Sequence, residues 1–295
     1  MRNKISPWAW VPTLYFAEGL PNVIVTIVSL VLYKQLGLSN AEITFYTSWL
    51  NLPWVVKPLW SPFVDAVKTK RWWVITMQLL IGASLGGVAF TIPTSMWLQS
   101  TLFFFWIMAF SSATHDIAAD GFYMLELNPH DQTFFVGIRS TFYRLASIFG
   151  QGVLVMIAGN IQVMLRGAIS YSWSLLFYGV AGIFIALWLW HNAKLPRPKD
   201  DTDHEQVTVT SVVSDLGKTI SSFFSKFPLK ETVFAFLFML LFRMPEGLLV
   251  KVSSLFLIDS QSCGGLGLSP AEYGFVQGTV CLLYTSPSPR DRTRS

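Results

Sequence analysis

Long blocks of apolar residues follow one another through this chain, and they constrain its fold more than any other feature. An α-helix rises about 1.5 Å per residue, so roughly 20 apolar residues cross a hydrocarbon core about 30 Å thick. Charged residues make up only 13% of the 295 residues, whereas soluble domains carry about 25%. We therefore expect an all-α transmembrane protein. Seven blocks are complete and an eighth begins at Ala271; the complete ones are 8–32, 43–64, 72–92, 97–125, 134–161, 171–190 and 232–258.

Lysine and arginine residues concentrate on one side of the predicted membrane if successive helices alternate in direction. The N-terminus and the segments after residues 64 and 190 carry most of them, while the other side has Lys34 and Arg166. Because cytoplasmic loops carry the basic excess, we expect the N-terminus in the cytoplasm. The loop 126–133 adds no such excess. We attribute the basic residues to topology in a lipid bilayer and expect no nucleic-acid partner.

The segment 194–230 separates the predicted domains. It opens with the charged, proline-broken run LPRPKDDTDHEQ, which is typical of a solvated linker. Apolar residues then recur at helical spacing over 209–227, which predicts an amphipathic helix in the membrane interface or on the protein's own cytoplasmic face. The predicted domains are an N-terminal six-helix half at 1–193, this loop, and the start of a C-terminal half at 231–280.

An internal repeat relates the first and seventh blocks. The string EGL at 18–20 recurs at 246–248, and GLS at 37–39 recurs at 267–269, so the offset is similar in both. Two six-helix halves related by such a repeat are the plan of the major facilitator transporters, which bind solute between the halves. We therefore predict a major facilitator fold, truncated to about seven complete helices and part of an eighth.

The stretch 281–295, CLLYTSPSPRDRTRS, ends the eighth block with prolines and charges. It resembles the conceptual translation of a sequencing adaptor, and we expect it to be foreign to the native protein. The alternative is a natural polar terminus. On the first interpretation the open reading frame continues past Val280 with four further spans after a completed eighth helix.

Ionisable residues inside the apolar blocks are the main functional candidates. Each costs at least ~2.5 to 3.5 kcal/mol in a bilayer, so it usually faces a partner or water. Asp116 and Asp120 are four residues apart and share one helix face. The next block brings Arg139 and Arg144 to comparable depths, which predicts an acidic pair facing a basic pair. Structural ion pairing and a role in proton relay or substrate contact both remain open.

Glu18 lies about ten residues into the first block, near the middle of the membrane, and Glu246 is its counterpart in the repeat. A carboxyl group removed from water favours proton uptake. Glu18 is therefore our leading candidate for proton coupling. The alternatives are pairing with Arg243 or Lys57, or a protonated carboxyl group bonded to backbone freed by a nearby proline.

The second block contains three prolines, which predict a locally irregular helix. Lys57 lies within it, and Asp65 lies at its predicted cytoplasmic end, followed by Lys70 and Arg71. An acidic residue beside a basic loop has the arrangement of a cytoplasmic gate. The alternative is an ordinary helix boundary.

Signals for an enzyme are weak. The sequence has no His-Glu-x-x-His, no Gly-x-Ser-x-Gly, no phosphate-binding glycine loop and no metal-spaced cysteine pair. We expect no catalytic residue, no metal and no cofactor. His115 beside Asp116 is a weak metal signal, and a structural histidine is the favoured alternative. An intramembrane enzyme at these two residues, or a membrane sensor without substrate, are the alternatives from other functional classes.

Four motifs carry a resemblance to a known family: GLP at 19–21, KPLWSPFVD at 57–65, SSATHDIAADGF at 111–122 and FYRLA at 142–146. The chain resembles the AmpG-type muropeptide permeases of the major facilitator superfamily, with the acetyl-CoA transporters as a more distant branch. The resemblance covers residues 8 to about 190 well. It implies proton-driven import of anhydromuropeptides, for peptidoglycan recycling, across the bacterial inner membrane. We expect a monomer, and an oligosaccharide or acyl-CoA-like solute is the alternative cargo.

Three positions bear on how far the family's chemistry transfers. The resemblance places Asp65 at the aspartate of the superfamily's loop between the second and third helices. Ser61 replaces the usual glycine there, and Glu18 and His115 differ from the residues expected in the enterobacterial members. The resemblance therefore implies the transport class more firmly than the cargo or the proton site.

Overall fold

The computed structural model describes residues 5–198, 217–218, 221–222 and 228–280. Regular secondary structure in these parts of the chain is entirely helical, which confirms the all-α transmembrane prediction. Most of the predicted amphipathic helix at 209–227, and the tail 281–295, fall outside the described residues.

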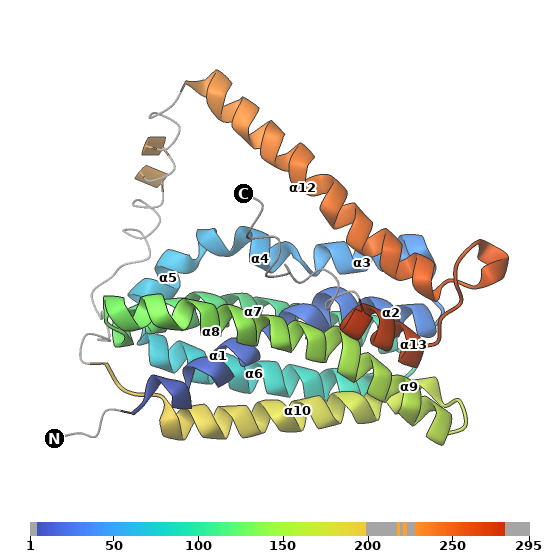
Figure 1. Ribbon diagram of the computed structural model, residues 1–295. Helices are drawn as coiled ribbons and strands as arrows, with labels where there is room; N and C mark the ends of the chain where they lie inside the picture. The colour runs from blue at the N-terminus through green and yellow to red at the C-terminus, as the bar shows by residue number, and fades with distance from the viewer. Residues whose placement is uncertain (1–4, 199–216, 219–220, 223–227, 281–295) are drawn as a thin grey trace, which may run out of the picture.

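Six helices in the described part of the chain are long and apolar enough to cross a membrane. Five of them form one bundle and the sixth leaves it at an angle (Figure 1). They correspond to six of the seven complete blocks predicted from sequence. The spans are Pro7–Gln35, Lys70–Thr91, Trp97–Glu126, Pro129–Met164, Ile169–Lys194 and Lys230–Ile258.

Two of the spans contain a widened π-helical turn. The first span consists of η1 (Pro7–Ala9), α1 (Val11–Val23), η2 (Ile24–Val28) and α2 (Ser29–Gln35); the fourth consists of α8 (Pro129–Ile148), η4 (Phe149–Leu154) and α9 (Val155–Met164). The remaining spans of the bundle are α6 (Lys70–Thr91), α7 (Trp97–Glu126) and α10 (Ile169–Lys194). We call the end of the bundle where α1 begins the near end, and the end where α2 finishes the far end.

The second predicted block is not one continuous helix. It is divided into α3 (Asn40–Trp49), α4 (Leu52–Val56), η3 (Lys57–Leu59) and α5 (Ser61–Ala66), which run in sequence along the bundle (Figure 1). Pro53, Pro58 and Pro62 each occupy one of the first two positions of a new segment. Proline has no amide hydrogen to continue a helix and fits its first turn. The prolines therefore set the breaks.

Most of the interior of the bundle is apolar. Helix α6 packs along both α7 and α10, while α1 packs along α8. Phe105, Trp173 and Phe177 are among the largest buried side chains of this core, and their rings contact one another edge-on or tilted. This packing fixes the faces that α1, α7 and α8 present to one another, and those faces carry the charged candidates.

The repeated GLS strings fold in the same way in both copies. Gly37 has φ of 92° and Gly267 has φ of 70°, values in the left-handed region that glycine adopts without a Cβ clash. Ser39 and Ser269 then each cap a helix through a reciprocal capping box with the glutamate three residues later. The sequence repeat is therefore also a repeat of backbone conformation.

The seventh block forms α12 (Leu229–Ile258), which touches the bundle near α3 and extends away from it toward its own N-terminus (Figure 1). The chain then returns through η5 (Gln261–Cys263) to α13 (Pro270–Phe275) and η6 (Val276–Val280). This return packs on α9 and η4. A Cβ atom added to Gly152 would lie 2.8 Å from the Cα of Gly278, so only glycine allows this approach. The eighth helix begins where the sequence predicts.

Candidate functional site

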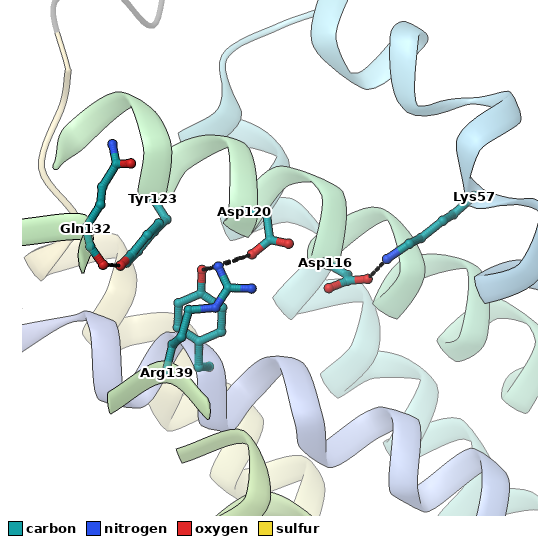
Figure 2. A network of polar contacts seen from close by, with 7 residues as sticks. Lys57, Asp116, Asp120, Tyr123, Gln132 and Arg139 are labelled. Carbon is teal, nitrogen blue, oxygen red and sulfur yellow. Dashed lines mark hydrogen bonds and ion pairs between the residues drawn. The ribbon is translucent and has the colours of Figure 1, made fainter. Parts of the chain in front are cut away.

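Charged side chains from four elements meet between α1, α7 and α8. Helix α7 contributes Asp116 and Asp120, one turn apart on the same face, and Figure 2 shows each with a different cationic partner. Lys57 approaches from η3 and Arg139 from α8. The predicted acidic pair is therefore a pair in space, and each acid holds its own ion pair.

Asp116 forms an ion pair with Lys57. The lysine is the first residue of η3, directly before Pro58, where the second block is interrupted. Its side chain is 37% exposed and that of Asp116 is 16% exposed. This pair is therefore only partly shielded from solvent, and it places Lys57 beside the acidic pair of α7.

Asp120 is held by an arginine and a tyrosine together. Arg139 Nη1 lies 3.1 Å from Asp120 Oδ1, and the hydroxyl of Tyr15 donates to the same oxygen at 3.0 Å. The guanidinium also donates to the Tyr15 hydroxyl at 3.3 Å and lies 4.8 Å from the centre of that ring. A second ring, that of Tyr123, lies 5.5 Å from the guanidinium. Aromatic faces stabilise a cation in this position, so Arg139 is fixed from three sides.

Glu18 lies on α1 with only 7% of its surface exposed. Its carboxyl group is a close neighbour of that of Asp116, with Asp120 and Arg139 also near enough to interact. Among the described residues, its Oε2 atom has no hydrogen-bond partner. Two carboxylates side by side repel each other, and a proton on one of them relieves that repulsion. Glu18 is therefore the carboxyl group at this site whose charge is least compensated.

The other predicted candidates lie elsewhere. Arg144 is exposed on α8, and within the described ranges no hydrogen bond or ion pair involves it; the predicted facing of Arg144 and the acidic pair is wrong, because Lys57 takes that place. Arg243 and Glu246 pair with each other within α12. Both are exposed there, at 74% and 62% of their side chains, so Arg243 is not the partner of Glu18.

Asp65, Lys70 and Arg71 gather at the near end of the bundle. Asp65 forms an ion pair with Lys70, whose amine also donates to the carbonyl of Val64 at 3.2 Å. Arg71 donates to carbonyl oxygens at the C-terminal end of α10, including that of Asn192 at 2.7 Å. The loop between α5 and α6 is thus tied both to itself and to α10.

A buried polar network of histidine, glutamine and threonine side chains was not predicted. The chain of contacts begins at Thr13, whose Oγ1 lies 2.9 Å from His191 Nε2, and ends at His115, whose Nε2 lies 3.0 Å from Gln78 Nε2. Gln78 Oε1 lies 2.9 Å from His191 Nδ1, which completes the chain. Both histidines and Gln78 are fully buried. The network ties α1, α6, α7 and α10 together behind the charged face.

The arrangement can hold protons and polar groups. Carboxylates accept hydrogen bonds, guanidinium and ammonium groups donate them, and the Tyr15 hydroxyl does both. Within the described residues, no group of three or more His, Cys, Asp or Glu side chains is arranged to hold a metal ion. His115 contacts Gln78 rather than a cluster of potential ligands.

Comparison with known proteins gives a consistent result. Residues 17–281 match the BT1 family. Two proteins named "Putative transporter AmpG 4", from Rickettsia felis and Rickettsia conorii, are 26% and 25% identical over 90% of this chain and 64% of their own length. An uncharacterized protein of Schizosaccharomyces pombe is 25% identical over 70% of this chain and 41% of its own length. The chain thus spans less than two thirds of the length of these curated relatives.

Proposed function

This chain belongs to the BT1 family, and from this premise we propose that it is part of a secondary active transporter. The transporter imports a bulky polar solute, an anhydromuropeptide fragment of the cell wall, by proton-coupled alternating access on the major facilitator plan. It lies in the bacterial inner membrane as a monomer with its N-terminus in the cytoplasm. The names of the two Rickettsia relatives, "Putative transporter AmpG 4", support a transport function, and the choice of solute rests on the resemblance of the sequence motifs to the muropeptide permeases.

The observation that carries this proposal is a charge imbalance inside the membrane. Three carboxyl groups, from Glu18, Asp116 and Asp120, meet two cations, Lys57 and Arg139. With all five groups ionised, one negative charge has no cation to compensate it. An uncompensated charge in a water-poor interior is costly, so a proton or a cationic group of the solute is favoured there.

This imbalance supplies a coupling mechanism. A proton on Glu18 leaves Lys57 to Asp116 and Arg139 to Asp120, and the site is neutral. When the site opens to the cytoplasm, water stabilises the Glu18 carboxylate and the proton leaves. Asp65 with Lys70 and Arg71 gates the near end, and the exposed Arg144 is available to an anionic group of the solute.

The test is uptake of labelled anhydromuropeptide by membrane vesicles that carry the protein expressed from its complete open reading frame. Uptake is measured as the external pH is lowered, for the parent protein and for Glu18→Gln. The parent takes up more solute at acid external pH, because an inward proton gradient drives it. Glu18→Gln keeps the shape of the side chain but cannot lose or gain a proton, so this dependence is lost.

Glu231→Gln is the matched control, because it makes the same chemical change on the exposed first turn of α12. It retains the parent's pH dependence. An unchanged pH dependence in Glu18→Gln rejects Glu18 as the proton site. Absence of solute accumulation in the parent rejects the proposed cargo, and metal in the purified protein together with a chemical reaction would point to an enzyme.

A further inference from the structure

The FYRLA motif at 142–146 contributes a residue to the central site that was not among the predicted site residues. Arg139, the partner of Asp120, lies on α8. A helix returns to nearly the same face after four residues, so the next side chain on this face is that of Tyr143. Arg144, which was predicted there, is exposed. Tyr143 therefore lies one helical turn from Arg139, toward the far end of the bundle.

The charged and polar side chains of α7 and α8 meet in two levels, because these consecutive spans run in opposite directions. Asp120 and Arg139 make the first level. One turn toward the far end, Asp116 of α7 and Tyr143 of α8 make the second. The Tyr143 hydroxyl is near enough to interact with the carboxyl groups of both Asp116 and Glu18. Tyr143 thus takes at the second level the place that Arg139 takes at the first.

Close packing of α8 on α1 holds the Tyr143 ring beside Glu18. A Cβ atom added to Gly19 would lie 3.0 Å from the backbone oxygen of Tyr143, 3.2 Å from Cδ2 of its ring and 3.1 Å from the Cβ of Ala146. The two helices therefore touch at Gly19, the residue directly after Glu18, and the tyrosine ring lies against the backbone there. Because this contact fixes the ring, its hydroxyl stays near the two carboxyl groups.

The Glu18 carboxyl group and the Tyr143 hydroxyl complement each other as acceptor and donor. The two cations of the site already pair with the aspartates. Oε2 of Glu18 is buried and has no hydrogen-bond partner among the described residues. A buried carboxylate without donors is costly, and a tyrosine hydroxyl can donate one hydrogen bond. The missing donor of Glu18 is therefore available from Tyr143.

We propose that Tyr143 is a positioning residue of the proton site, whose hydroxyl donates a hydrogen bond to the Glu18 carboxylate after the proton has left. This role rests on the proposed function, in which Glu18 carries the coupled proton. While Glu18 is protonated, its own hydroxyl donates to the Asp116 carboxylate. Once the proton has passed to water, Glu18 can only accept, and rotation about the C–O bond of Tyr143 turns the donor toward it. Tyr143 keeps its own proton throughout.

The other titratable groups that face Glu18 are engaged elsewhere or cannot donate. The complete set is Asp116 and Asp120 from α7, Arg139 and Tyr143 from α8, and Tyr15 from α1 itself. The aspartate carboxylates only accept hydrogen bonds, while Arg139 and Tyr15 both bind Asp120. On α10, which also packs against α1, His191 contacts Thr13, and η2 and η4 carry no titratable side chain. Among the described residues, Tyr143 is thus the donor left for Glu18.

The test follows the infrared carbonyl band of the protonated Glu18 carboxyl group as the pH is varied, in the complete protein purified in lipid nanodiscs. The band is identified by its loss in Glu18→Gln. Tyr143→Phe keeps the ring that packs on Gly19 and removes only the hydroxyl, so the ionised form of Glu18 loses a donor. The pH midpoint of the band therefore rises by roughly one to two units. Tyr178→Phe makes the same change at an exposed position of α10 and leaves the midpoint unchanged.

A second replacement tests the direction of the effect. Replacing Tyr143 with ortho-fluorotyrosine changes the shape very little, and its more acidic hydroxyl is a stronger donor, so the midpoint of the Glu18 band falls below that of the parent. A tyrosine with a purely structural role would affect the unfolding temperature without moving the midpoint. An unchanged midpoint in Tyr143→Phe, or a shift in the same direction for both replacements, overturns the proposal. If Tyr143→Phe does not fold, an unchanged midpoint in the fluorinated protein overturns it.

Uptake measurements separate this role of Tyr143 from the transport proposal. If the Glu18 midpoint responds to both replacements but the parent accumulates no anhydromuropeptide, the cargo is wrong and the role of Tyr143 stands. If uptake is coupled to protons and the coupling is lost in Glu18→Gln, while both Tyr143 replacements titrate like the parent, the proton site stands and the role of Tyr143 is overturned. A parent protein in which no Glu18 band titrates rejects the proton site and the role of Tyr143 together.

Discussion

Lys57 reaches Asp116 because the helix that carries it is interrupted at Pro58. We predict that Lys57→Met destabilises the folded protein by about 1 to 3 kcal/mol, less than for a fully buried pair because the lysine is partly exposed. The reason is that Asp116 is left beside Glu18 with no cation. Adding Asp116→Asn to the Lys57→Met variant recovers most of the loss. Thermal unfolding in detergent measures both effects.

The double variant decides the interpretation of this experiment. If Lys57→Met and Asp116→Asn add like independent changes, the two side chains are not coupled and the ion pair does not contribute as described. The matching control is Lys230→Met, which removes a similar side chain from an exposed position and leaves the unfolding temperature nearly unchanged.

The residue spacing correctly predicted that Arg139 lies beside the acidic pair, but it wrongly placed Arg144 there as well. Asp116 and Asp120 share a face because four residues bring a helix nearly back to the same side. Arg139 and Arg144 are five apart, or about 140° round the axis, so they cannot both face the acids. That arithmetic was available from the sequence. The role of Lys57 was not, because it depends on how the segments on either side of Pro58 are oriented.

At the scale of elements, the buried network behind the charged face makes the sharpest prediction. Gln78→Leu leaves both His115 and His191 without their shared partner, and each unsatisfied buried polar group costs about 1 to 3 kcal/mol. We expect a lower unfolding temperature and weaker association of α6 with α7 and α10. Thermal unfolding and limited proteolysis of the purified protein measure these effects.

Ser84→Ala is the control for that variant. Ser84 is also buried on α6, but its hydroxyl donates only within its own helix, to the carbonyl of Leu80. Its removal changes stability by a few tenths of a kcal/mol to about 1 kcal/mol, the usual range for one hydrogen bond. Equal losses in Gln78→Leu and Ser84→Ala would mean that the network between helices adds nothing.

Long elements were predictable and their interruptions were less so. Of the seven complete apolar blocks that were predicted, six are long helices, and the eighth begins at α13 as predicted, because hydrophobic length is a property of the local sequence. The prolines predicted irregularity between residues 43 and 64, but not its division into four segments. The network of Gln78 and His191 was missed because a single polar residue in an apolar block does not reveal its partner. Isolated glutamine and histidine residues inside such blocks were the available signal.

At the scale of the whole molecule, the orientation in the membrane is open to a direct test. Cys263 is exposed in the turn after α12, at the far end. If the N-terminus is cytoplasmic, the far end faces outward. We therefore predict that an impermeant maleimide added to intact cells labels Cys263 in a Cys281→Ser background. Labelling only after the membrane is permeabilised would reverse the orientation, and Cys263→Ser gives the background signal.

The arrangement of the two halves was only partly predictable. The repeated strings predicted two related units, and their equivalent turns at Gly37 and Gly267 agree with that prediction. The direction of α12 could not be predicted, because it depends on contacts between residues far apart in the sequence, such as the apolar packing of Leu255 in the core and the hydrogen bond of Asn40 with Asp259, more than 200 positions away. No local periodicity encodes such a contact.

The divided segment between Asn40 and Ala66 bears on how this molecule can change shape. Bending α6 or α7, which run unbroken for 22 and 30 residues, would sacrifice hydrogen bonds within an intact ladder. The segment between Asn40 and Ala66 already lacks helical hydrogen bonds where the prolines divide it, so a rotation at these breaks, the joints between its four segments, costs little free energy. The segment carries Lys57 in η3 and Asp65 in α5, toward the near end of the bundle. A small rotation at those joints would move the side chains of Lys57 and Asp65 together.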